Sequence, residues 1–337
     1  MKKLLLILLC LPMIGFGQQT YVPDDNFEQA LINFGYDNVL DDYVTTANIN
    51  TIVSLFVHLQ NISDLTGIEG FSALQNLHCH GNQLISLDVS SNTALTVLFC
   101  HSNQLTDLDL SNNTVLGSLS CYDNPLTSLN ISTAIALTEL RCWNSLLASL
   151  DVSNNLSLEF LACLNNQLIS LDVSQNTALR ELYCHNNQLT NLDIGNNTTL
   201  DTLKCSGNQL TTLDVSGATA LAKLKCSGNQ LTSLDLRNGN NTNIIYLKCA
   251  DNPNLSCINV DDSTYSTSNW IGVDFEFNSQ HYFSNNCSGT TDIEEYTTNK
   301  ELLKVTDLLG RETKGKKNEP LFYIYDDGTV DKQIIIE

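Results

Sequence analysis

Leucine and cysteine recur along most of the chain at a fixed spacing. From Leu74 onward each unit of 21 residues reads L-x-x-L-x-C-x-x-N-x-L-x-x-L-D-V-S-x-N-T-x. The L-x-C alternation places leucine and cysteine on the same face of a short strand. A fixed period of this length predicts a solenoid. The cysteine column comprises Cys79, Cys100, Cys121, Cys142, Cys163, Cys184, Cys205, Cys226 and Cys249.

One such unit cannot bury its apolar face alone, whereas stacked units bury it against one another. We therefore expect a parallel sheet with strands about 4.8 Å apart. About ten units of 21–23 residues cover 52–256, and the first carries Val57 in the cysteine column. The short period leaves little room for a helix opposite the sheet, so short 3₁₀ or extended turns are expected there.

The pattern resembles the leucine-rich-repeat family, L-x-x-L-x-L-x-x-N-x-L, with cysteine in place of the third strand leucine. The L-T-G-I-E-G-F sequence at 65–71 is similar to the L-x-G-I-E-x-F of bacterial internalin-type repeats. The resemblance implies an α/β-type leucine-rich-repeat solenoid, or horseshoe. Its parallel sheet would be concave, its convex turns mostly non-helical, and a small β-rich segment would follow at the C-terminus.

Three polar columns can be explained by the fold. An inward asparagine amide can bond the backbone groups freed where each strand turns, and so form a ladder. The cysteines are expected to be small buried thiols, with disulfides between neighbours as the alternative. Each aspartate of the L-D-V segment can accept hydrogen bonds within its own turn. The alternative for this column is a ladder of Ca²⁺ sites.

The segments outside the repeats divide the remaining chain. Residues 1–17 read as a signal peptide, with Lys2 and Lys3 before a short apolar run. Residues 18–51 are expected to form an N-terminal cap that begins with a helix near Pro23. A C-terminal cap at 257–287 would be closed by a disulfide between Cys257 and Cys287. A polar linker follows at 288–300.

The last segment, 301–337, predicts three strands with a hairpin at Asp327-Gly328. Its D-L-L-G-R-E, F-Y-I-Y-D-D-G-T-V and terminal K-Q-I-I-I-E sequences resemble the C-terminal sorting domain of the bacterial type IX secretion system. The upstream strands of that domain, often opened by a Y-P-N-P-like motif, are absent. The resemblance implies passage across the outer membrane of a Gram-negative bacterium, followed by release or surface anchoring.

Net charge narrows the range of partners. The 337 residues carry 37 acidic and 16 basic side chains, a formal charge of −21, which argues against nucleic-acid binding.

After the signal peptide no segment offers about 18 uninterrupted apolar residues, so no transmembrane segment is expected in the mature chain. The sequence shows no P-loop, no G-x-S-x-G and no H-E-x-x-H motif. We expect neither catalysis nor a cofactor.

The strand residues that flank the buried leucine and cysteine vary between units and are expected to line the concave face. Exposed rings on a rigid sheet can form a platform that stacks on sugars or packs on peptides, although β-propensity alone also places rings on strands. The lysines could recognise an acidic glycan or a carboxylate, or they could serve solubility. The candidate ligand-binding residues are Phe99, Tyr122, Arg141, Trp143, Phe160, Tyr183, Lys204, Lys225 and Lys248.

His78, His80 and His101 occupy neighbouring positions on this face and could hold a transition metal, although solvent-facing histidine is common.

The sequence favours an exported, non-catalytic binding module that recognises an extracellular or surface protein or glycan, as in adhesion. It would be secreted or displayed on the outer-membrane exterior, and its C-terminal segment would engage the secretion machinery. The alternative is a structural surface-layer or scaffold protein without a specific ligand.

Overall fold

The computed structural model describes residues 17–287, 302–306, 311–313, 320–325 and 330–334. The chain divides into two compact units, the first ending at Cys287 and the second beginning at Ser288. Residues 1–16 of the predicted signal peptide and the predicted linker at 288–300 lie outside the described residues. No described helix is both long enough and apolar enough to cross a membrane.

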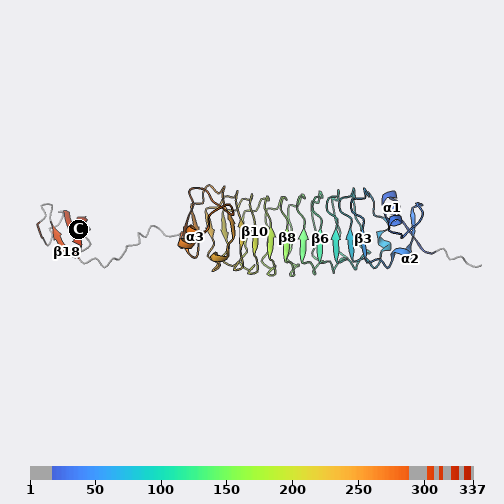
Figure 1. The fold of residues 1–337 in the computed structure, drawn as a ribbon, viewed down its shortest axis with the longest axis horizontal. Coiled ribbons are helices and arrows are strands. Elements are labelled where there is room, and N and C mark those ends of the chain that lie inside the picture. Colours follow the sequence, from blue (N-terminus) through green and yellow to red (C-terminus); the bar gives the residue numbers. More distant parts are fainter. Residues whose placement is uncertain (1–16, 288–301, 307–310, 314–319, 326–329, 335–337) are drawn as a thin grey trace, which may run out of the picture. The chain divides into compact units, whose positions relative to one another are not determined.

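Eleven short parallel strands form one continuous sheet along the first unit, as the repeat predicts, and Figure 1 shows them side by side in a row. The neighbours pair in register, so that Leu55, Leu77 and Leu98 face one another across the ladder. The strands are β3 (Ser54–Phe56), β4 (Asn76–His78), β5 (Val97–Phe99), β6 (Ser118–Ser120), β7 (Glu139–Arg141), β8 (Phe160–Ala162), β9 (Glu181–Tyr183), β10 (Thr202–Lys204), β12 (Lys223–Lys225), β14 (Tyr246–Lys248) and β16 (Phe275–Glu276).

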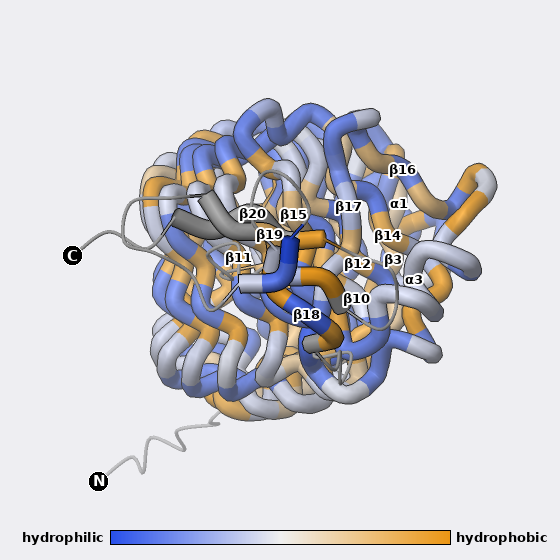
Figure 2. Tube along the Cα trace, turned by 90° about the vertical axis from the view of Figure 1, so that its left-hand side faces the viewer, coloured by the Kyte–Doolittle hydropathy of each residue, from blue (hydrophilic) through white to orange (hydrophobic). Residues whose placement is uncertain are grey.

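The core runs through the inside of the stacked coils. The central leucine of each repeat strand and the cysteine that follows it are fully buried. Figure 2 looks along the stack, and hydrophobic positions recur around its successive coils. All nine column cysteines are free thiols, which is the arrangement favoured by the sequence. Burial raises the pKa of Cys100 and of Cys163 to about 12, so these thiols stay protonated.

The asparagine column forms the predicted ladder between coils. Asn103 Nδ2 donates to the Cys79 carbonyl at 3.1 Å and to the Cys100 carbonyl at 2.9 Å. Its Oδ1 accepts from the Leu84 N–H at 3.0 Å. Ser145 interrupts this ladder and reaches only the Trp143 carbonyl, at 3.5 Å. A second, fully buried asparagine column was not predicted from the sequence and comprises Asn92, Asn113, Asn155, Asn176 and Asn197.

The aspartate column is explained by its own turns. Asp88 Oδ1 accepts the Ser90 N–H at 2.9 Å, and Asp151 accepts the Ser153 N–H at 2.9 Å. Hydrogen bonds from Ser90 lower the pKa of Asp88. Among the described residues, the only three potential metal-ligand side chains that converge are Glu28, Asp37 and Asp41, which lie outside this column. The observed bonds therefore favour the structural account over a Ca²⁺ ladder.

A second parallel sheet, not predicted from the sequence, lies on another side of the C-terminal coils. Its strands are β11 (Thr212–Asp214), β13 (Ser233–Asp235), β15 (Cys257–Asn259) and β17 (Tyr282–Ser284). The remaining connections between the repeat strands are short turns, as expected. The helical segments are α1 (Asp25–Asn33), α2 (Thr46–Ile49) and α3 (Ser263–Asn269), together with the 3₁₀ turns η1 (Ile68–Gly70) and η2 (Asn241–Asn243).

The first segment before the repeats packs on the first coils. Strands β1 (Gln19–Tyr21) and β2 (Tyr43–Thr45), which precede and follow α1 in the sequence, pair antiparallel. Phe27 and Leu31 of α1 belong to the same core cluster as Leu55 of the first repeat strand. Asp24 caps the helix, because its side chain accepts the N–H groups of Asn26 and Phe27.

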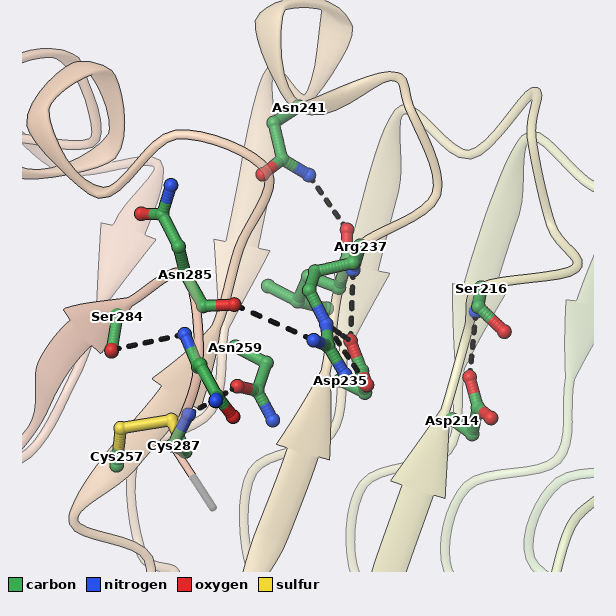
Figure 3. A network of polar contacts seen from close by, with 12 residues as sticks. Asp214, Ser216, Asp235, Arg237, Asn241, Cys257, Asn259, Ser284, Asn285 and Cys287 are labelled. Carbon is green, nitrogen blue, oxygen red and sulfur yellow. Dashed lines mark hydrogen bonds and ion pairs between the residues drawn. A yellow bond between two sulfur atoms is a disulfide. The ribbon is translucent and has the colours of Figure 1, made fainter. Parts of the chain in front are cut away.

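The C-terminal coils are closed by the predicted disulfide between Cys257 and Cys287 (Figure 3). Asn259 Oδ1 accepts the Cys287 N–H at 2.6 Å, which ties the closing segment to β15. Arg237 forms an ion pair with Asp235 at 2.5 Å and donates to the Asn285 carbonyl at 3.4 Å.

In the second unit, β18 (Leu302–Thr306), β19 (Pro320–Tyr325) and β20 (Val330–Ile334) form the predicted three-stranded antiparallel sheet.

Candidate functional site

The outward side of the eleven-stranded sheet, which we call the strand face, carries a continuous stack of five rings. The rings belong to the column that follows the cysteines, and His58 begins the stack. Neighbouring ring centroids lie 4.7, 4.3, 4.1 and 3.8 Å apart, with interplanar angles of 2–19°. We call this set the ring stack, and its members in order are His58, His80, His101, Tyr122 and Trp143.

The stacking determines which surfaces of these rings remain accessible to a ligand. His80, His101 and Tyr122 are covered on both faces by neighbouring rings, so only their edges remain accessible. Within the ring stack, a sugar can therefore stack on a ring face only at one of the two ends, which are His58 and Trp143. Strand spacing explains the arrangement, because rings one above another on strands about 4.8 Å apart are brought to stacking distance.

Phe99 belongs to a second, shorter group of rings in the column before the cysteines. Its ring centroid lies 4.5 Å from that of His78, which in turn lies 4.8 Å from that of Phe56. The structure therefore does not bring Phe99 into the same stack as Tyr122 and Trp143. The strand face carries two ring columns side by side, because the residues before and after each buried cysteine both point outward.

The middle of the strand face is a chain of charged and aromatic contacts. Arg141 pairs with Glu139 at 2.5 Å, and its guanidinium lies 4.9 Å from the centroid of Phe160. Phe160 meets Tyr183 edge to face at 5.5 Å. The Tyr183 hydroxyl donates to Glu181 at 2.5 Å. Four predicted site residues, Arg141, Phe160, Tyr183 and Lys204, thus form one connected group, because the Lys204 ammonium lies 4.4 Å from the Tyr183 ring centroid.

The lysines lie at the C-terminal end of the strand face. A hollow of about 200 Å³ opens there between β10, β12 and β14, and we call it the lysine pocket. Lys248 lies beside the pocket and pairs with Glu276 at 3.3 Å. Lys223 and Tyr246 were not among the candidate residues predicted from the sequence. The pocket is lined by Leu203, Lys204, Lys223, Lys225 and Tyr246.

The surroundings of His78, His80 and His101 on the strand face lower the pKa of each. Partial burial lowers the pKa of His101 to about 4, and the nearby His80 contributes in the same direction. Burial and the charge of His58 lower the pKa of both His78 and His80. Within the part of the chain that the structure describes, His78, His80 and His101 do not form a group of three converging ligand atoms. Their arrangement is a stack of parallel rings, in which His80 and His101 lie 4.3 Å apart.

The comparisons with known proteins agree with this architecture. The functional domain of internalin J from Listeria monocytogenes, a structure that includes a cysteine ladder, is 30% identical to this chain with a TM-score of 0.56. That match covers 80% of this chain and 72% of the internalin J domain. Internalin C2 from the same species is 18% identical, covers 72% of this chain and 97% of its own, and has a TM-score of 0.54. The second likeness shows the fold alone.

These features define a leucine-rich-repeat solenoid with a cysteine column. The chain belongs to the internalin-like leucine-rich-repeat proteins. Among curated proteins, Internalin J of Listeria monocytogenes is 34% identical over 73 residues, which are 22% of this chain and only 8% of that protein. No family model matches the chain.

Proposed function

We propose that this protein is an exported, non-catalytic binding module that recognises an extracellular or surface protein or glycan through its strand face, as in adhesion. The observation that carries the proposal is the preformed array that runs from the ring stack to Lys204. Its side chains are fixed by stacking and ion pairs, so little conformational entropy is lost when a partner binds. The relationship to internalin J supports the same class of function.

The end of the ring stack at Trp143 is the strongest anchor that the array offers. Trp143, Tyr122 and Arg141 are residue types enriched at binding hot spots. The Trp143 and Tyr122 ring centroids lie 3.8 Å apart, and both side chains are half-buried. Each therefore presents a fixed apolar surface together with a polar edge. A partner that covers this end would exclude water from rings whose positions are already set.

Replacing both Tyr122 and Trp143 with alanine is expected to weaken partner binding about a hundredfold, because two hot-spot rings are lost. Binding of the full chain would be measured against immobilised glycans and extracellular-matrix proteins. The matched control replaces Tyr21 and Tyr43, two exposed rings 5.4 Å apart that lie outside the strand face. Equal losses in both double variants, or self-association without any saturable ligand, would favour the structural-scaffold alternative.

We also propose that the chain is exported to the exterior of a Gram-negative outer membrane by the type IX secretion system. The signal-like residues 1–17 and the sorting-like sequences in 301–337 support this route. The antiparallel pairing of β18, β19 and β20 supports a folded C-terminal segment that the machinery could recognise.

Deleting 301–337 is expected to leave the protein in the periplasm of a host that has this secretion system. The solenoid should fold, because it forms its own compact unit. Cell fractionation with an antibody against the solenoid would locate it. As a control, the full chain should reach the exterior in the same host. Equal export of the truncated chain would contradict a sorting role for the segment.

A further inference from the structure

We propose that the lysine pocket binds an acidic polysaccharide, with the lysines pairing a carboxylate or sulfate group and Tyr246 packing on the sugar ring. This inference rests on the proposed function, because it names a ligand class for one end of the strand face. The pocket lies at the C-terminal end of that face, whereas the ring stack ends at Trp143 on the coil of β7. The two regions can therefore be tested separately.

The distribution of basic side chains singles out this place. Between 18 and 287 the sequence has 26 acidic residues and only seven basic ones, Arg141, Arg180, Lys204, Lys223, Lys225, Arg237 and Lys248. Four of these seven lie on three neighbouring strands, β10, β12 and β14. In a strongly acidic protein, a local cluster of positive charge is the part of the surface that attracts anionic ligands.

The strand register places the lysines at matching positions on neighbouring strands. Lys204 pairs with Lys225, and Lys225 pairs with Lys248, in successive parallel strands. Lys223 lies opposite Tyr246 in the same ladder. Like charges that face one another across neighbouring strands destabilise a sheet. A bound anion would relieve this repulsion, so the cluster is better matched to an occupied pocket than to an empty one.

Acidic neighbours do not neutralise the pocket. Lys248 is paired with Glu276, and Glu181 on β9 accepts from the Tyr183 hydroxyl. Within the described residues, neither Lys223 nor Lys225 has a carboxylate within ion-pair distance. The field of the cluster reaches the adjacent coil. There, burial first and then Lys204 and Lys225 lower the pKa of His185.

The shape of the pocket favours a sugar over an acidic peptide. Its volume of about 200 Å³ is several times the roughly 30 Å³ that one water occupies in the liquid, so it has room for a ring-sized group. Its accessible lining combines the Tyr246 ring with Lys204, Lys223 and Lys225, whereas Leu203 at its base is a buried core residue. A sugar ring can pack its apolar face on an aromatic ring while its acidic substituent pairs with lysine. An extended acidic peptide would pair with the lysines but would not require the aromatic ring of Tyr246.

The test measures binding of polygalacturonate to the full chain by titration calorimetry, with dextran sulfate as a sulfated probe and dextran as an uncharged one. We expect saturable binding of an acidic polysaccharide, weakened by salt, and none of dextran. Replacing Lys225 with glutamine should weaken binding at least fivefold, and replacing Tyr246 with leucine at least tenfold. Whichever acidic polysaccharide binds identifies carboxylate or sulfate as the preferred group.

The matched control is Arg180→Gln, which removes one positive charge from an exposed side chain outside the pocket. An equal effect of Arg180→Gln and Lys225→Gln would show that only net charge matters and would overturn the proposal. So would polyglutamate that binds as well as the polysaccharide and is insensitive to Tyr246→Leu, because that outcome identifies an acidic peptide site. Absence of binding by the folded chain also overturns it.

The Tyr122→Ala/Trp143→Ala variant separates this inference from the proposed function. It should keep its affinity for the acidic polysaccharide, because neither ring lines the pocket. If another partner binds through the ring stack while acidic polysaccharides do not bind, the pocket proposal fails and the binding-module proposal stands.

Discussion

Replacing Asn208 with alanine is expected to lower the free energy of unfolding by about 3 kcal/mol. Asn208 Nδ2 donates to the carbonyls of Cys184 and Cys205 at 3.1 and 3.0 Å, and its Oδ1 accepts the Leu189 N–H at 3.0 Å. Alanine would leave these three buried backbone groups without the partner that Asn208 supplies. Each such group costs about 1–3 kcal/mol, partly offset by relaxation and water entry. Chemical denaturation followed by circular dichroism would measure the loss.

Two further variants make this prediction specific to the ladder. Asn196 is exposed and makes one weak bond, at 3.3 Å to the Ser174 carbonyl, so Asn196→Ala should change stability by less than about 0.5 kcal/mol. Ser145→Asn should stabilise the protein by about 1 kcal/mol, because it supplies the missing amide where the ladder is interrupted. Similar effects of Asn208→Ala and Asn196→Ala would contradict a special role for the buried column.

Replacing Asp24 with alanine is expected to cost about 2–3 kcal/mol of stability at neutral pH. Its Oδ1 caps α1 by accepting from Asn26 and Phe27, each at 3.0 Å. Its Oδ2 accepts from the Ser63 N–H, the Ser63 hydroxyl and the Asp64 N–H at 2.7–3.1 Å. One carboxylate thus joins the first helix to the first repeat. Loss of a helix cap alone costs about 1 kcal/mol, and bonds to a charged group add more.

The effect of Asp24 should depend on pH in a defined direction. Partial burial acts to raise the pKa of Asp24, but the hydrogen bonds from Ser63, Phe27 and Asp64 outweigh it and hold the pKa below its ordinary value. A lowered folded-state pKa adds stability above the unfolded value of about 3.9, and that stability is lost as pH falls through the folded-state pKa. The difference between wild type and Asp24→Ala should therefore shrink in strong acid.

Denaturation at pH 7 and near pH 2 would check this pH dependence. Asp25→Ala is the matched control, because Asp25 is exposed and adjacent but makes no bond to the first repeat. It should cost only about 0.5 kcal/mol through the helix dipole. A stability difference for Asp24→Ala that is the same at both pH values would show that packing, and not the charged hydrogen bonds, carries the effect.

The repeat pattern was sufficient to predict most of the fold. Leucine and cysteine at alternate strand positions leave one way to bury both, which is to stack the coils, and the observed core follows it. The asparagine ladder was also predictable, because a buried amide must bond the backbone that turns beside it. The disulfide between Cys257 and Cys287 was predicted because these cysteines lie outside the repeating column, and the structure confirms it.

The arrangement of the strand face could be predicted only in part. The sequence shows which residues point outward, but ring orientation depends on the neighbours of each ring in space. His58 was therefore overlooked as the start of the ring stack, and Phe99 was grouped with rings that it does not join. The second sheet was not predicted, because strands of three residues such as Thr212–Asp214 and Ser233–Asp235 differ little from neighbouring turns in local sequence.

The coil-to-coil bonding has a consequence for how such proteins can change in evolution. Each coil is joined to the next by the same leucine contacts and mostly the same asparagine bonds, whichever coils they are. Duplicating or deleting one whole unit of 21 residues, such as 158–178, would therefore rejoin the chain with every column still in register. Length can then vary in whole units through recombination while the ends stay intact. The ring stack and the lysine pocket could be moved apart or brought together without redesigning either.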